Sequence, residues 1–134
     1  MSISSWQPES DLTTVKIETQ ELDEFVALGH SDVVEKSTKQ LTQEQIEKLQ
    51  IYIKQSRAFW MQQAENISTE KLHNLIRFFT LAEENNSDLY CGNDSPVIAF
   101  NKVLKKRSEA LDKDFLQWIK SHSTNRFLPN GSIL

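Results

Sequence analysis

The sequence predicts an all-α protein, a compact bundle of about five helices with a docked C-terminal tail. The chain of 134 residues has only three glycines and three prolines, which is low for an all-β protein that turns every 8–12 residues or so. Apolar residues recur at spacings of three and four over several segments, which is the period of a helix. Serine, threonine or aspartate precedes most of these segments, where helix-capping residues belong.

The length is sufficient for one domain with its own core. We expect a single helical domain over residues 1–134. It would consist of an acidic N-terminal arm with one short helix (1–40), a helical core (41–122) and an apolar C-terminal tail (123–134).

The arm is expected to begin with an irregular leader over residues 1–14. Residues 20–28 then form a short helix, because Leu22, Phe25 and Val26 share one face. Gly29 is expected to end this helix in a left-handed conformation. Residues 30–40 are interpreted as a linker.

The clearest helix start is the capping box formed by Thr42 and Gln45. We expect one continuous helix from there to about Asn66, although the apolar run at 51–53 is also compatible with a strand. The predicted buried stripe of this helix consists of Ile46, Leu49, Ile53, Ser56, Trp60 and Ala64.

Three further serine or aspartate caps set the remaining elements. Ser68 precedes a helix over 69–84 that is apolar on more than one side and is therefore expected to be central. Residues 84–94 are interpreted as a polar loop. Ser95 then caps a helix over 96–107, and Asp112 caps a last helix over 113–121.

Charge is distributed unevenly along the chain, whose net charge is −4. Residues 1–95 contain 8 basic and 16 acidic side chains, whereas residues 96–134 contain 7 basic and 3 acidic ones. The two parts either attract each other within one molecule or face different partners.

The C-terminal segment is unusually apolar for a chain end. Leu128-Pro129-Asn130-Gly131 favours a turn, which would fold the last residues back on the bundle. The alternative is a short recognition peptide for another protein. The candidate partner-binding residues of this tail are Phe127, Leu128, Ile133 and Leu134.

A basic stretch offers a second kind of partner. Positive side chains three and four residues apart on a helix can follow a phosphate backbone, although lysines near a helix C-terminus also interact favourably with the helix dipole. The candidate phosphate contacts are Lys102, Lys105, Lys106, Arg107 and Arg126.

No catalytic or metal-binding motif is apparent. His30, His73 and His122 lack the spacing of a helical zinc site, and the acidic residues of the 84–94 loop lack the spacing of a calcium site. Cys91 has no histidine near it in sequence. An enzyme would need a site assembled from scattered residues such as Cys91, His73 and Glu83, so we assign no catalytic residue, metal or cofactor.

The sequence favours the cytoplasm. Its start has neither a basic nor an apolar signal region, and no apolar run exceeds four residues, whereas a membrane span needs about 20. The single cysteine is compatible with a reducing compartment.

The C-terminal half resembles a group of small uncharacterised bacterial proteins. The resemblance is carried by LIRFFTLAE (75–83), SPVIAF (95–100), KKR (105–107), WIK (118–120) and NRFLPNGS (125–132). It implies a stand-alone bacterial cytoplasmic protein and no particular activity.

The leading functional hypothesis is therefore a non-enzymatic interaction or adaptor protein that binds another protein or a second copy of itself. A nucleic-acid-binding module that uses the basic C-terminal third is the alternative, and a small enzyme is the third hypothesis. We expect no association with a membrane.

Overall fold

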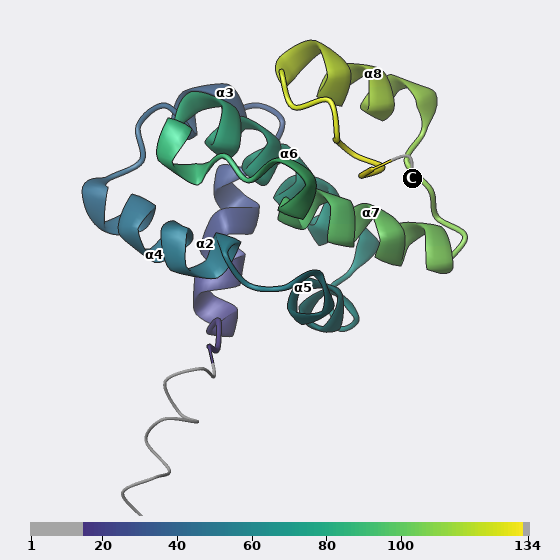
Figure 1. The fold of residues 1–134 in the computed structure, drawn as a ribbon, viewed down its shortest axis with the longest axis horizontal. Coiled ribbons are helices and arrows are strands. Elements are labelled where there is room, and N and C mark those ends of the chain that lie inside the picture. The colour runs from purple at the N-terminus through teal and green to yellow at the C-terminus, as the bar shows by residue number, and fades with distance from the viewer. Residues whose placement is uncertain (1–14, 133–134) are drawn as a thin grey trace, which may run out of the picture.

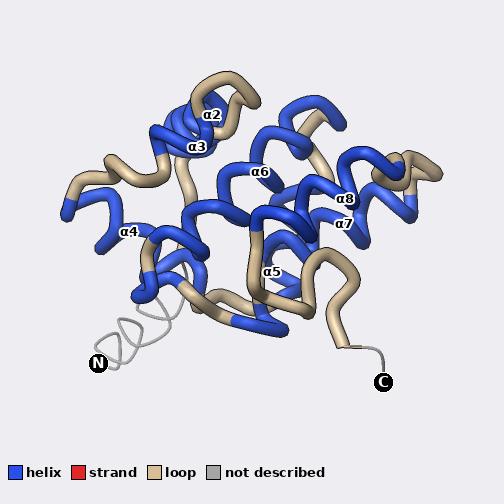
Figure 2. Tube along the Cα trace, turned by 90° about the horizontal axis from the view of Figure 1, so that it is seen from above, coloured by secondary structure: helices blue, strands red, loops and turns tan. Residues whose placement is uncertain are grey.

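The computed structural model describes residues 15–132, and all of the regular secondary structure in this range is helical. The predicted all-α class is confirmed (Figures 1 and 2). The predicted leader (residues 1–14) and the last two tail residues, Ile133 and Leu134, lie outside the described residues. The elements in chain order are α2 (Thr19–Leu28), α3 (Val34–Ser37), α4 (Gln43–Ile53), α5 (Arg57–Ala64), α6 (Thr69–Asn85), the 3-10 turns η1 (Ser87–Leu89) and η2 (Gly92–Asp94), α7 (Pro96–Lys106) and α8 (Lys113–His122).

The central helix is α6, as the sequence predicted. It contacts α2, α3, α7, α8 and η1, and Figure 1 shows it in the middle of the molecule. Ser68 caps its first turn by accepting the amide of Lys71 at 3.3 Å. Its buried residues are Leu72, Leu75, Ile76, Phe78, Phe79, Thr80, Leu81, Ala82 and Glu83.

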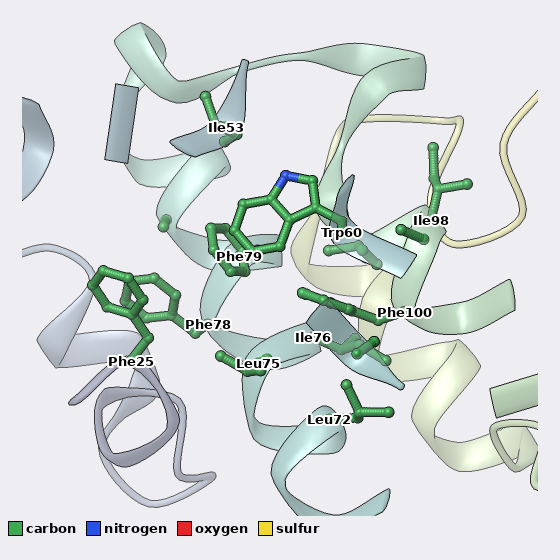
Figure 3. Close-up of a cluster of buried hydrophobic side chains, with 14 of the residues drawn as sticks. Phe25, Ile53, Trp60, Leu72, Leu75, Ile76, Phe78, Phe79, Ile98 and Phe100 are labelled. Atoms are coloured by element: carbon green, nitrogen blue, oxygen red, sulfur yellow. The ribbon is translucent and has the colours of Figure 1, made fainter. Parts of the chain in front are cut away.

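An aromatic cluster connects α6 to three other helices (Figure 3). The Trp60 ring of α5 meets Phe79 of α6 edge-on, with centroids 5.4 Å apart, and Phe100 of α7 at 5.7 Å. Phe25 of α2 stacks on Phe78 at 5.1 Å. Such pairs add roughly 0.5–1.5 kcal/mol each beyond the area that they bury. The short helix of the acidic arm is therefore part of the core.

The expected continuous helix over 42–66 is wrong, because the chain is interrupted at residues 54–56. The capping box at its start is present: Thr42 Oγ1 accepts the Gln45 amide at 3.1 Å, and Gln45 Oε1 accepts the Thr42 amide at 2.8 Å. Ser56, predicted to be buried, is extended and exposed, and its hydroxyl accepts the Phe59 amide as the cap of α5. The break lets α4 pack on η1 while α5 packs on α7.

The segment 30–40 is more ordered than the predicted linker. It contains α3, in which Val34 is buried, and Thr38 after it is fully buried. Thr38 Oγ1 accepts a hydrogen bond from Asn85, and its carbonyl accepts one from Asn86. Two asparagines at the end of α6 therefore hold a segment that has few apolar residues of its own.

Gly29 ends α2 for a reason different from the predicted one. Its φ is −89°, so it is not left-handed. A Cβ atom there would overlap the backbone carbonyl oxygen of Asn74 and lie 3.0 Å from Phe78 Cβ. The glycine therefore allows the end of α2 to approach the backbone of α6.

The described part of the C-terminal tail, residues 123–132, docks on the bundle, as expected. Leu128 is 3% exposed and belongs to the core. Asn101 of α7 donates to the Pro129 carbonyl and to Asn130 Oδ1, both at 3.2 Å. Asn125 is buried and donates to the Gly92 carbonyl at 3.0 Å.

Candidate functional site

Two basic residues of the C-terminal third, Lys105 and Arg107, are directed to different sides of α7. Lys105 donates to Asn130 Oδ1 of the tail at 2.9 Å. Arg107 donates to the carbonyls of Ala64 and Glu65, at 2.8 and 3.2 Å, and so caps the C-terminal end of α5. Two of the five candidate phosphate contacts therefore make structural hydrogen bonds on different sides of α7.

A groove between α5 and α7 lies beside Arg107. It has a volume of about 430 Å³ and is lined by Ala58, Met61, Gln62, Glu65, Val103, Lys106 and Arg107. We call it the α5–α7 groove. It forms because the large side chains of α5, above all Trp60, point into the core, which leaves the small Ala58 and the flexible Met61 on the outer side.

The groove combines an apolar floor with charged ends. Met61 is half-buried and Val103 is 6% exposed, so the floor is partly covered by the fold itself. Lys106 and Arg107 contribute two positive charges against the single carboxylate of Glu65. The ion pairs of residues 15–132 lie elsewhere, at His30–Asp32, Lys48–Glu21 and Lys71–Asp23. The positive end is therefore not neutralised by a close carboxylate contact within this range.

The tail residues proposed for partner binding have different environments. Leu128 packs in the core and Phe127 is half-buried against it. Arg126 is exposed, with no ion pair among the described residues. In the isolated chain, Leu128 therefore contributes to the packing of the protein itself.

Glu83 of α6 is the most unusual polar residue of the core. It is 4% exposed, and its Oε2 accepts a hydrogen bond from the Ser95 hydroxyl at 2.5 Å. Its Oε1 has no hydrogen-bond partner of good geometry among the described residues. Two other buried side-chain atoms in this range, Trp60 Nε1 and Thr80 Oγ1, also lack a partner. Burial raises the pKa of Glu83 to about 8, against smaller opposing effects of hydrogen bonds from Ser95 and from the Cys91 thiol.

Cys91 lies next to Glu83 but is not an activated thiol. Burial raises its pKa well above the usual value, and the charge of Glu83 raises it further. A nucleophilic cysteine requires the opposite shift. His73 stands ten residues before Glu83 on the same helix, about 15 Å away along the axis. The structure therefore brings Cys91 and Glu83 together but leaves His73 apart.

His73 belongs to a different surface. Its ring meets that of Phe115 edge-on at 5.1 Å, and burial followed by the charge of Arg77 lowers its pKa. Arg77 lies over the Phe115 ring at 5.4 Å and donates to the Gly29 carbonyl at 3.0 Å. These contacts connect α2, α6 and α8.

Residues 15–132 contain neither an evident metal site nor a membrane-spanning helix. No group of three or more histidine, cysteine, aspartate or glutamate side chains in this range is arranged to hold a metal ion. No helix in the same range is both long enough and apolar enough to cross a bilayer.

The α5–α7 groove and the buried state of Glu83 were not foreseen in the sequence. For Glu83 a signal existed, since it follows Ile76 and Phe79 at spacings of seven and four and therefore continues their buried face. The groove had no comparable signal, because it depends on the break between α4 and α5.

Comparison with protein-family models, curated proteins and solved structures found no match for this chain. No activity, ligand or partner is therefore transferred from a relative.

Proposed function

We propose that the protein is a non-enzymatic interaction protein and that its α5–α7 groove binds an apolar segment of another protein. The observation that carries the proposal is the combination of an accessible apolar floor, at Ala58 and Met61, with a positive end at Lys106 and Arg107. The proposed setting is the cytoplasm of a bacterium. It is supported by the single cysteine and by the resemblance of the C-terminal half to small bacterial proteins.

The proposed ligand is an amphipathic helix with a carboxylate near one end. Grooves between two helices commonly accept such a helix, with apolar side chains spaced by three and four residues. Met61 suits this role because its unbranched side chain adapts to different partners. Lys106 and Arg107 favour an acidic ligand, and the fixed position of Arg107 on the α5 carbonyls reduces the entropy lost on binding.

The nucleic-acid alternative has less support. A phosphate-binding face needs several free cations on one side, whereas Lys105 and Arg107 make hydrogen bonds on different sides of α7. The enzyme alternative is weakened by the raised pKa of Cys91 and by the distance of His73 from Glu83.

Two peptides test the groove directly. Both are fluorescein-labelled amphipathic helices with the same leucine positions; one carries glutamates on its polar face and the other carries lysines. We expect the acidic peptide to bind the full chain, and Ala58→Glu to weaken its binding at least about tenfold by filling the groove and repelling the ligand. Ala27→Glu is the matched control, because Ala27 is exposed on α2.

Lys106→Glu tests whether peptide binding depends on charge or on nonspecific apolar contact. It should weaken the acidic peptide and not the basic one. Equal binding of both peptides, or equal loss in the Ala58→Glu and Ala27→Glu variants, would contradict the groove. Salt-sensitive binding of a short DNA duplex that is stronger than that of either peptide would favour the nucleic-acid alternative.

A further inference from the structure

The buried hydrogen bond between Glu83 and Ser95 joins two helices at a critical point. Ser95 is the N-cap of α7, and its hydroxyl oxygen accepts the Val97 amide at 3.2 Å. The same hydroxyl donates to Glu83 Oε2 near the C-terminal end of α6. We call this pair of contacts the Glu83 latch. It fixes the start of α7 to α6 through a single side chain.

The surroundings of the latch disfavour a negative charge on Glu83. On its own helix it has Glu84 as a neighbour, and the C-terminal end of a helix repels a carboxylate. The facing loop contributes the Cys91 thiol, with Asp94 beyond it. The one cationic residue of α5, Arg57, donates to the Asn93 carbonyl instead. The first turn of α7 carries only Pro96, Val97, Ile98 and Ala99.

We propose that Glu83 is a proton-controlled latch: while it is protonated, residues 91–95 stay fixed on α6, and its ionisation releases them locally and increases the exposure of Cys91, which is only partly exposed in the closed form. A protonated carboxyl is satisfied by the contact with Ser95 at little electrostatic cost. An ionised carboxylate in the same place leaves Oε1 charged and buried, with only the weak S–H donor of Cys91 near Glu83 and no cation bound to it among the described residues. Opening the segment lets water reach both oxygens.

The pH window follows from the direction of the shift. In the open segment Glu83 has its ordinary pKa of 4.5, whereas burial raises the pKa of the closed form to about 8. Between these values the open form is ionised and the closed form is not, so the equilibrium constant for opening rises about tenfold for each pH unit. Below pH 4.5 and above pH 8 the equilibrium constant for opening does not change with pH, because Glu83 then carries the same charge in both forms.

Release of residues 91–95 would also affect the segments that they contact. The Gly92 carbonyl accepts from Asn125 of the tail, and the Asn93 carbonyl accepts from Arg57 of α5 at 2.8 Å. Asn93 Oδ1 accepts the Ser132 amide at 2.8 Å. The segment therefore couples the protonation of Glu83 to the tail and to the start of α5, where a pocket of about 430 Å³ is lined in part by Cys91, Tyr90 and Arg57.

Amide hydrogen exchange of the full chain, followed by NMR from pH 5 to 9, tests the latch. After correction for intrinsic exchange, protection of the Val97 amide should fall about tenfold per pH unit up to pH 8 and then level off. In Glu83→Gln the profile should be flat, because the amide keeps an acceptor for Ser95 and does not ionise. The Gln45 amide, held by the Thr42 cap, is the internal control and should not follow this profile.

The comparison with global unfolding decides whether the latch is local. Val97 should be less protected at every pH than Leu75 in the core of α6. Identical protection of Val97 and Leu75 would mean that only global unfolding frees the segment, and a pH-independent Val97 profile would mean that Glu83 does not control it. Either result overturns the proposal, and both are measurable on the wild-type chain even if the variant does not fold. Alkylation of Cys91 by iodoacetamide, corrected for the thiolate fraction, should increase over the same pH range.

Discussion

Replacing Leu128 by alanine should destabilise the protein strongly, although the residue lies only six positions before the last residue of the given sequence. Leu128 is 3% exposed and packs with the core. The substitution removes three buried carbon atoms and leaves space among residues that cannot fully relax. Such changes cost about 2–5 kcal/mol in the free energy of unfolding.

The lower part of that range is the better expectation for a tail. A chain end relaxes into a vacated space more easily than the middle of a helix, but here its path is fixed on both sides of Leu128. Asn125 holds the Gly92 carbonyl, and Pro129 and Asn130 are held by Asn101. We therefore expect a loss of roughly 2–3 kcal/mol. For a chain of this size this corresponds to a midpoint lower by about 6–12 °C.

Thermal unfolding followed by circular dichroism measures the effect on the full chain. Arg126→Ala is the matched control, because Arg126 is exposed two positions earlier in the same tail, and it should shift the midpoint by no more than about 2 °C. A Leu128→Ala midpoint that coincides with that of the control would refute the packing argument. The tail would then again be a candidate recognition peptide for another protein.

Two further substitutions test how α6 is held by its neighbours. Gly29→Ala should lower the free energy of unfolding, measured by urea titration, by about 1–3 kcal/mol, because the added Cβ overlaps the Asn74 carbonyl and forces α2 away from α6. An unchanged free energy of unfolding would show that the two helices are farther apart than the structure places them. Glu83→Gln should gain stability relative to wild type by about 1.4 kcal/mol per pH unit as the pH rises from 5 to 8. The sign follows because the raised pKa means that the folded wild type binds a proton that the unfolded chain releases. A constant difference between the two proteins over this range would show that Glu83 titrates normally.

Helix starts were predictable because they depend on local chemistry. Thr42, Ser68, Ser95 and Asp112 each cap a helix through a hydrogen bond to an amide two or three residues ahead. That interaction needs no information from the rest of the chain. The predicted helices over 69–84 and 96–107 therefore agree with α6 and α7 to within one residue at each end.

The predictions for residues 42–66 and 30–40 were wrong because contacts with distant residues outweigh the local preference of these segments. Ser56 fits the apolar period poorly, but only the different partners of α4 and α5 explain why the helix ends there. Thr38 is buried because Asn85 and Asn86, almost fifty positions later, bind it. Neither the break at Ser56 nor the burial of Thr38 depends on its own segment alone, so the local sequence pattern could not predict them.

The same distinction applies to the candidate groove. The spacing of Lys102, Lys105 and Lys106 shows that they share a helix but not what lies opposite them. The tail occupies the side of Lys105, and α5 occupies the side of Arg107, which leaves Lys106 at an open groove. A basic stretch that resembles a phosphate-binding surface is thereby divided among three environments.

Glu83 shows why a polar residue at a core position needs a chemical explanation rather than a packing one. Leucine would fill the space but leave the Ser95 hydroxyl without its acceptor, whereas glutamine would retain the acceptor. The property that glutamate alone adds is a proton that it can lose. Comparison of Glu83→Leu with Glu83→Gln therefore separates the two contributions: if only leucine weakens the protection of the Val97 amide at pH 5, the hydrogen bond holds the start of α7. If only the wild type loses that protection between pH 5 and 8, the proton controls its release.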